Sequence, residues 1–225
     1  RLSKRHGAVS VMQYRDEGFL PDALVNYLAR LGWSHGDDEV FSRGQLVEWF
    51  DLEHVSRSPA RWDPEKLRWL NGEYLKRIPP AELVAGIRAR NPALHAEISE
   101  AMDAEAMTTL AAGSWSLITE HEAFLHEMAS PETSDPAVVA QYLDEKGRAV
   151  VGRLAAALEP VEWSAPAVKA ALQSFVKEGG YKMPEVMMPL RVAVTRKTQT
   201  KAIDAIVAAL RKDVVLERLR HAASG

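Results

Sequence analysis

The sequence predicts an all-α fold divided into small domains. Apolar residues recur three or four positions apart over nearly the whole chain, which is the spacing of one helix face. Prolines, glycines and capping residues interrupt this pattern where helices are expected to begin and end. A single segment, Leu190–Thr195, has the composition of a strand, and it is too short and isolated to build a sheet. With 225 residues and 47% hydrophobic content, the chain can bury two or three small cores.

The first eighty residues predict three helices. Pro21 occupies a first helical position, and Gly32 closes that helix. Ser42 begins the second helix and forms a capping box with Gln45, and Asp63-Pro64 begins the third. The residues expected to face the core are Leu24, Val25, Leu28 and Leu31 in the first helix, Leu46, Val47 and Phe50 in the second, and Leu67, Leu70 and Tyr74 in the third.

Two proline-containing segments predict the domain boundaries. Pro79-Pro80 ends the third helix, and the polar segment 130–136 marks a second boundary. The expected domains are therefore 1–80, 81–134 and 135–225, and the last four residues are expected to be disordered. Beyond the first boundary, helices are expected around Leu83, Val84 and Ile87, from Asn91-Pro92 onward, and from Ile118 to Met128. A single long helix is expected to begin at Asp135-Pro136 and to run through Val139 to Leu158. The next helix is expected to contain Val168, Leu172 and Phe175 and to end at Gly179-Gly180.

Charge is distributed unevenly along the chain. Residues 1–90 carry 14 Lys/Arg and 13 Asp/Glu, a net charge of +1. Residues 91–145 carry 11 acidic residues and no Lys or Arg, whereas residues 146–225 carry 14 basic and 7 acidic residues. The overall charge of −3 thus hides an acidic middle and a basic end.

Composition excludes several classes of site. No apolar run approaches the roughly 18 residues that a membrane-spanning helix needs. The chain has no cysteine, so it has neither disulfides nor thiolate metal sites, and a cytoplasmic location is expected. His121 and His126 lie five positions apart and do not share a helix face, so no metal site is predicted.

A short basic loop, Arg1-Leu2-Ser3-Lys4-Arg5-His6-Gly7, opens the chain. An ammonium group and backbone N–H groups suit ATP phosphates, where negative charge builds as pyrophosphate leaves. For this string alone, a solvated basic turn is the more common explanation. The sequence that follows favours the nucleotide interpretation through a set of further motifs: AVSVMQYRDEGFLP at 8–21, NYLARLGWSHG at 26–36, SRSP at 56–59, KLRWLN at 66–71, MP at 183–184, MPLRVAVT at 188–195 and ID at 203–204.

Together these motifs resemble the C-terminal part of bacterial glutamyl-tRNA synthetases, which are class I aminoacyl-tRNA synthetases, from their second signature loop onward. The family usually has lysine where Arg1 stands, and the match weakens over residues 81–160. The resemblance implies a stem-contact region over 1–80 followed by two helical-bundle anticodon-binding domains. Glutaminyl enzymes share the loop but continue into β-barrels, which the helical period excludes.

The resemblance implies a glutamate–tRNA ligase, which attaches glutamate to tRNA with ATP in translation. Lys4 matches the central lysine of the loop and is the implied catalytic residue, and Ser3, Lys4, Arg5 and His6 are the implied ATP-binding residues. The first signature motif and most of the nucleotide fold, which would hold most of the ATP and the glutamate, would lie N-terminal to Arg1. We therefore expect this chain alone to be inactive. The alternative is a non-catalytic module that binds tRNA or another partner.

A glutamate-accepting tRNA is the expected partner, and we expect it to be bound by the two ends of the chain. The acidic middle would repel phosphates, and near residues 110–117 it reads LAAGSWSL where the family usually has a basic, anticodon-reading segment. The family also usually has glycine where Arg196 stands and later a proline, where Lys201 stands. The expected tRNA-binding residues are Arg57, Arg61, Lys66 and Arg68 early in the chain, and Arg191, Arg196, Lys197 and Lys201 late in it.

Three of these interpretations have alternatives. Trp115 could stack on a base or pack inside the protein, and packing is the more common role. Arg191 could contact tRNA or form a structural ion pair. The acidic middle could dock onto the basic end of the chain, which would make both sets of charges internal partners.

Overall fold

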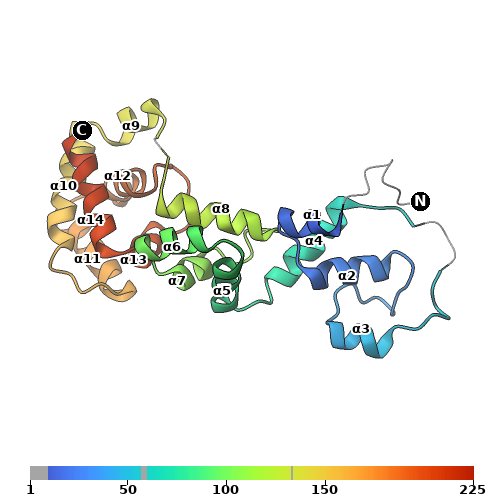
Figure 1. Cartoon of the computed structure of the whole chain (residues 1–225). Coiled ribbons are helices and arrows are strands. Elements are labelled where there is room, and N and C mark those ends of the chain that lie inside the picture. Colours follow the sequence, from blue (N-terminus) through green and yellow to red (C-terminus); the bar gives the residue numbers. More distant parts are fainter. Residues whose placement is uncertain (1–9, 57–59, 133) are drawn as a thin grey trace. The chain divides into compact units, whose positions relative to one another are not determined.

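A computed structural model describes residues 10–56, 60–132 and 134–225. These residues form fourteen helices and no strand, only two isolated β-bridges, which confirms the predicted all-α fold (Figure 1). The helices are α1 (Val11–Glu17), α2 (Pro21–Arg30), α3 (Arg43–Trp49), α4 (Pro64–Leu75), α5 (Pro80–Arg90), α6 (Pro92–Ala101), α7 (Ala104–Leu110), α8 (Ile118–Ala129), α9 (Pro136–Tyr142), α10 (Glu145–Leu158), α11 (Ala165–Glu178), α12 (Met183–Thr195), α13 (Ile203–Ala209) and α14 (Lys212–Ser224).

The chain forms two compact units. Unit 1 contains Arg1–Glu82 and Ala112–Ala123, and unit 2 contains Leu83–Ala111 and Phe124–Gly225. The chain therefore leaves unit 1, returns to it for one short segment, and leaves it again. The division into domains 1–80, 81–134 and 135–225 stays a prediction.

Unit 1 has a small core between α2 and α4. Its buried cluster consists of Leu24 and Tyr27 from α2 and Leu67 and Leu70 from α4. Helix α4 begins where the sequence predicts, because the Asp63 side chain accepts hydrogen bonds from the first turn and Pro64 follows it. The capping box of Ser42 and Gln45 at the start of α3 also forms.

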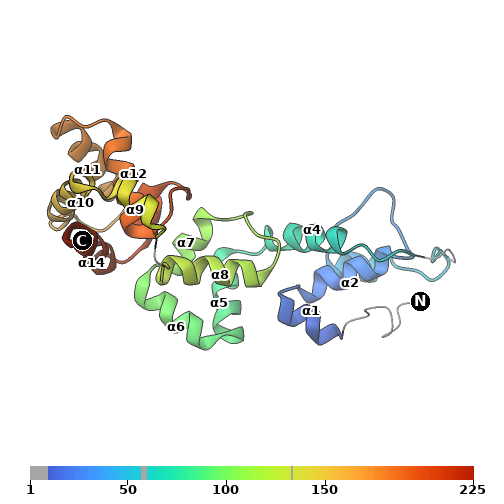
Figure 2. The ribbon, with the colours of Figure 1, turned by 90° about the horizontal axis from the view of Figure 1, so that it is seen from above.

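Unit 2 has a much larger core, with thirty buried hydrophobic residues among those described. Helix α10 is central to it and packs against α11, α12 and α14 (Figures 1 and 2). Gly147, in the first turn of α10, is required by the tight turn that precedes this helix, since a Cβ at position 147 would lie 2.1 Å from the carbonyl oxygen of Tyr142. This turn divides the single long helix expected up to Leu158 into α9 and α10, with Asp144 capping the second.

The strand expected at Leu190–Thr195 is wrong, because this segment is the last half of α12. Five of its six residues are buried, since helices pack around α12 on several sides. A short continuous apolar run fits a buried helix as well as a strand, and only its neighbours decide between them. Likewise the last four residues are not disordered, since α14 continues to Ser224 with Ala222 buried.

Four side chains expected in the core are exposed instead. Val25 and Leu28 on α2 are 40% and 45% exposed, and Val47 and Phe50 at α3 are 78% and 41% exposed. Helix α2 packs Leu24 and Tyr27 against α4, and Val25 and Leu28 lie to one side of this buried face. The described part of unit 1 therefore covers only part of the apolar stripe of α2.

Candidate nucleic-acid interface

The expected nucleotide loop lies outside the described residues. Ser3, Lys4, Arg5 and His6 fall in the stretch 1–9, and Arg57 falls in the stretch 57–59. The geometry below therefore concerns the other expected tRNA-binding residues.

In unit 1, two of the expected cations form ion pairs. Lys66 Nζ lies 2.7 Å from both carboxylate oxygens of Glu39 and 4.0 Å from the ring centre of Trp69. The hydrogen bond from Lys66 lowers the pKa of Glu39 below its ordinary value. Arg68 forms an ion pair with Glu120, and Arg61 is exposed. Phosphate binding at Lys66 or Arg68 would therefore have to compete with a carboxylate.

Glu120 has a structural role that its sequence position does not reveal. Its carboxylate accepts hydrogen bonds from the backbone N–H groups of Ser116 and Leu117, at 2.7 and 3.0 Å, and satisfies free donors before the first turn of α8. Burial by itself would raise the pKa of Glu120, but these two bonds and the charge of Arg68 lower it overall. Arg68 thus helps to hold segment 112–123 in place, because it pairs with the carboxylate that binds the backbone of this segment.

Asn71 joins the same segment to the rest of unit 1. It is fully buried; its side-chain oxygen accepts the Leu20 N–H at 2.7 Å, and its side-chain nitrogen donates to the Ser116 carbonyl at 2.6 Å. Close by, Ile118 N donates to Gly18 O at 3.0 Å. One asparagine on α4 therefore ties together two chain segments about a hundred residues apart.

Replacing Asn71 with leucine is expected to destabilise unit 1 by about 2 kcal/mol, because a buried N–H and a buried carbonyl lose their partners. Urea unfolding followed by circular dichroism measures the loss. Asn91→Leu is the control, since Asn91 is exposed and only caps α6, which is worth about 1 kcal/mol. Equal losses in the two variants would contradict the bridging role.

Trp115 packs inside unit 1. Its side chain is 7% exposed and stacks on His121, with ring centres 4.1 Å apart. This arrangement confirms the packing interpretation of Trp115. His121 is fully buried, and burial lowers its pKa from 6.5 to about 4, so the imidazole is neutral at pH 7.

In unit 2, the expected cations gather where α12 ends. Arg191 Nη1 donates to the Thr198 carbonyl at 3.5 Å, and Lys197 forms an ion pair with Glu127. Arg196 adopts a left-handed backbone conformation with φ 61° at the end of α12, which residues other than glycine and asparagine rarely adopt. Lys201 is exposed. One acidic residue of the middle segment is thus an internal partner of this basic end.

Arg218 has a structural role in this region that could not be predicted from the sequence pattern. Its guanidinium donates to the carbonyls of Met128 and Ala129 at 3.0 and 2.6 Å, and to that of Val194 at 2.9 Å. These carbonyls lie at the ends of α8 and α12, where helices leave acceptors unpaired. Burial, then the charge of Arg196, lowers the pKa of Arg218 to about 10, so it stays charged at pH 7.

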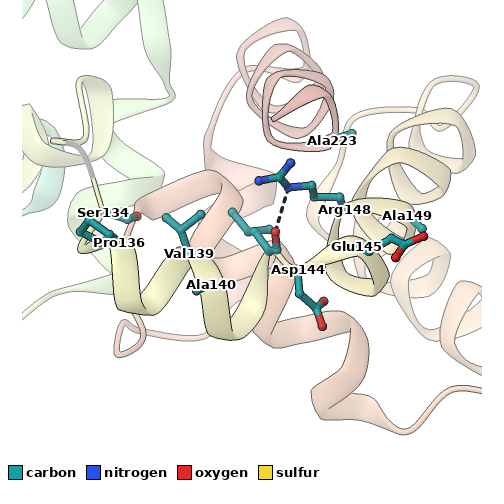
Figure 3. Close-up of a pocket in the computed structure, with 10 residues that line it drawn as sticks. Ser134, Pro136, Val139, Ala140, Asp144, Glu145, Arg148, Ala149 and Ala223 are labelled. Atoms are coloured by element: carbon teal, nitrogen blue, oxygen red, sulfur yellow. Dashed lines mark hydrogen bonds between the residues drawn. The ribbon is translucent and has the colours of Figure 1, made fainter.

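Unit 2 also has a pocket of about 890 Å³ between α9, α10 and the end of α14 (Figure 3). Its walls are mostly apolar, and Arg148 is held across it by a hydrogen bond from Nε to the Leu143 carbonyl at 2.9 Å. None of the expected site residues lines it. The described part of the chain contains no group of three or more potential metal ligands and no helix long and apolar enough to cross a membrane.

Comparisons with known proteins match both ends of the chain. Residues 1–69 match the family model described as tRNA synthetases class I (E and Q), catalytic domain, and residues 112–223 match the model described as anticodon binding domain. Glutamate–tRNA ligase of Dechloromonas aromatica is 46% identical over 97% of this chain, and that of Bordetella avium is 44% identical over 98%. A crystal structure of a glutamate tRNA ligase from Elizabethkingia meningosepticum has the same fold, with a TM-score of 0.80 over 94% of this chain and 24% identity.

The helical fold and the two family matches define part of a class I aminoacyl-tRNA synthetase. The chain belongs to the glutamate–tRNA ligase family and corresponds to the C-terminal part of its members, as the sequence motifs predict. It spans 47% of the length of each of the two curated relatives named above and 42% of the Elizabethkingia chain.

Proposed function

We propose that this chain is the tRNA-binding part of a ligase that activates glutamate with ATP and transfers it to a glutamate-accepting tRNA. The observation that carries the proposal is the order of the two family matches, a catalytic-domain match at 1–69 and an anticodon-binding match at 112–223. Relatives named glutamate–tRNA ligase align with nearly the whole chain, which supports the same assignment.

Within this proposal, the basic loop at the start of the chain serves the ATP site. We assign Lys4 the role of stabilising the negative charge that develops on the phosphates. Ser3, Arg5 and His6 are assigned to ATP binding with it. Most of the contacts to ATP and all of those to glutamate are assigned to the part of the enzyme that contains the first signature motif. The described residues supply the surface for tRNA.

The end of α12 and the loop after it are the best candidates for phosphate contacts in unit 2. Arg196, Lys197 and Lys201 lie within six consecutive residues of this loop. Lys197 is already paired with Glu127, so the tRNA gains less from it than from an unpaired cation. The other expected contacts, Arg191 in unit 2 and Arg61, Lys66 and Arg68 in unit 1, stay proposals, as does Arg57.

Replacing Arg196, Lys197 and Lys201 together with glutamine is expected to reduce the slope of log K against log salt for tRNA binding by about 2–3, because each lost phosphate contact removes about 0.9. Filter binding or fluorescence anisotropy with a glutamate-accepting tRNA transcript measures the slope. The control replaces three other lysines of unit 2 with glutamine: Lys169, Lys177 and Lys182.

The control removes the same charge from α11 and the start of α12 and is expected to change the slope by less than about 1. If the first triple variant lowers the melting temperature and leaves the slope unchanged, the three cations are internal partners of the acidic segment. That outcome would contradict their assignment to tRNA.

A further inference from the structure

Unit 2 has a second pocket, of about 360 Å³, which we call the two-tyrosine pocket because Tyr142 and Tyr181 line it. It lies between the end of α9, the first half of α10 and the start of α12, and it shares Asp144 and Ala149 with the pocket of Figure 3. Its volume is within the range of small-molecule sites in proteins. Within the described part of the chain, none of the residues assigned above to ATP or to tRNA lines this pocket.

The apolar walls of the two-tyrosine pocket are formed by aromatic rings and prolines. Besides the two tyrosines, they include Val150, Pro184 and Pro189. The Tyr181 ring is held in place, because it stacks on Phe175 with ring centres 5.7 Å apart and planes 16° apart, and its backbone N–H donates to the Val176 carbonyl at 3.0 Å. Neither phenol hydroxyl has a hydrogen-bond partner among the described residues. The pocket therefore offers flat apolar surfaces with two free polar groups.

Two cations from α10 also line this pocket. Lys146 and Arg153 lie seven positions apart, on one face of the helix. Arg153 Nε donates to the Ala149 carbonyl at 3.4 Å, and its guanidinium lies 5.4 Å from the ring centre of Tyr181. Among the residues that the structure describes, neither cation forms an ion pair with a carboxylate. Both charges are therefore free to bind an anion.

The two carboxylates at the pocket are bound to backbone groups instead. Asp144 accepts the Gly147 N–H at 2.8 Å, and Glu185 accepts the Lys182 N–H at 2.6 Å. Each carboxylate thus caps the start of a helix, α10 or α12, where the helix dipole favours a negative charge. The positive ends of the two helices compensate these carboxylates, so the side-chain cations remain for a ligand.

We propose that the two-tyrosine pocket binds a small anion that carries a planar ring, either a nucleoside monophosphate or an aromatic carboxylate. Lys146 and Arg153 bind the anionic group through charge-assisted hydrogen bonds. The ring lies against the tyrosines and prolines, because apolar and aromatic walls bind planar rings. The phenol hydroxyls and the Gln141 amide supply donors and acceptors for the ring edge. This site goes beyond the tRNA-binding role and uses none of the residues assigned to it.

Titration calorimetry on this chain tests the proposal with four probes: adenosine monophosphate, indole-3-acetate, inorganic phosphate and adenosine. Lys146→Gln combined with Arg153→Gln is expected to weaken binding of the ring-bearing anions about tenfold or more, since it removes both charged partners. Lys169→Gln combined with Lys177→Gln is the control, because it removes the same charge from α11 and is expected to change binding less than about twofold. All four positions are exposed, so both variants are expected to fold.

The probes distinguish the two sources of the ligand. Binding of adenosine monophosphate without indole-3-acetate identifies a nucleotide site, and the reverse identifies a carboxylate site. Phosphate and adenosine each carry half of the recognised chemistry, so each is expected to bind about tenfold or more weakly than the intact nucleotide if the ligand is a nucleotide.

Three results would overturn the proposal. The first is that neither ring-bearing anion binds at millimolar concentration. The second is binding that the Lys146 and Arg153 substitutions leave unchanged, which would place the anion elsewhere, for example on the basic loop at the start of the chain. The third is a loss of tRNA affinity in this variant while neither free anion binds, which would assign the pocket to RNA.

Failure of this inference is distinguishable from failure of the proposed function. The salt slope for tRNA binding is measured on the same chain and is assigned to Arg196, Lys197 and Lys201, which do not line the pocket. A normal slope with an empty pocket would therefore reject the small-anion site and keep the tRNA-binding role.

Discussion

Replacing Arg218 with methionine is expected to destabilise unit 2 by about 3–5 kcal/mol, because it removes the donors from three partly buried carbonyls at once. These acceptors, on Met128, Ala129 and Val194, lie at the ends of α8 and α12. A cation at a helix C-terminus is also favoured by the helix dipole. Methionine keeps an unbranched stem, so the variant removes the charge and the hydrogen bonds and changes packing little.

Arg220→Met is the matched control for this prediction. Arg220 lies on the same helix, is exposed and pairs with Glu159 at the surface, and such pairs are worth about 0–1 kcal/mol. Urea unfolding gives the two stabilities, and hydrogen exchange of peptides from α8 and α12 shows where protection is lost. A difference of less than about 1 kcal/mol between the two variants would reject the role of Arg218.

Lowering the pH from about 6.5 to about 4 is expected to remove about 3 kcal/mol of stability from unit 1 through His121 alone. Burial lowers the pKa of this side chain from 6.5 to about 4, so between these values the unfolded chain binds a proton that the folded chain does not. Stability therefore rises with pH across this window and is fully present above it. Protonation would place a charge against Trp115 in a fully buried site.

The contribution of His121 is measured as a difference between variants, since carboxylates also titrate in this range. The folded-state pKa of Glu120 is lowered, so its contribution to the stability of unit 1 is also lost as the pH falls. His121→Gln should flatten the dependence of unfolding free energy on pH between 4 and 6.5, whereas His221→Gln, at an exposed position, is the control and should leave it unchanged. Identical pH profiles for the wild type and His121→Gln would exclude a buried neutral imidazole.

Helix starts could be predicted from sequence because their signals are local. Asp63, Asn91 and Asp135 each cap a helix that begins with the following proline, and capping depends on three or four adjacent residues. The family could be predicted for a similar reason, since its motifs are short contiguous stretches at the two ends of the chain.

The errors arose where distant residues decide the outcome. Leu190–Thr195 is helical because several helices surround it, and its own six residues do not carry that information. The partners of Arg218 on α8 lie 89 and 90 residues away, and Asn71 joins Leu20 to Ser116. Such contacts have no sequence signature, so the residues that hold the candidate site in place could not be predicted from the pattern.

The path of the chain between the two units has a consequence for the order of folding during synthesis. Residues 83–111 belong to unit 2, and residues 112–123 return to complete unit 1. Chains emerge from the ribosome N-terminal end first. Unit 1 therefore cannot complete its fold until residues 112–123 have been synthesised, and by then residues 83–111 of unit 2 have already been synthesised. No single cut in the gene separates the units, and a shortened version that stops at residue 82 would leave Asn71 without Ser116 and Arg68 without Glu120.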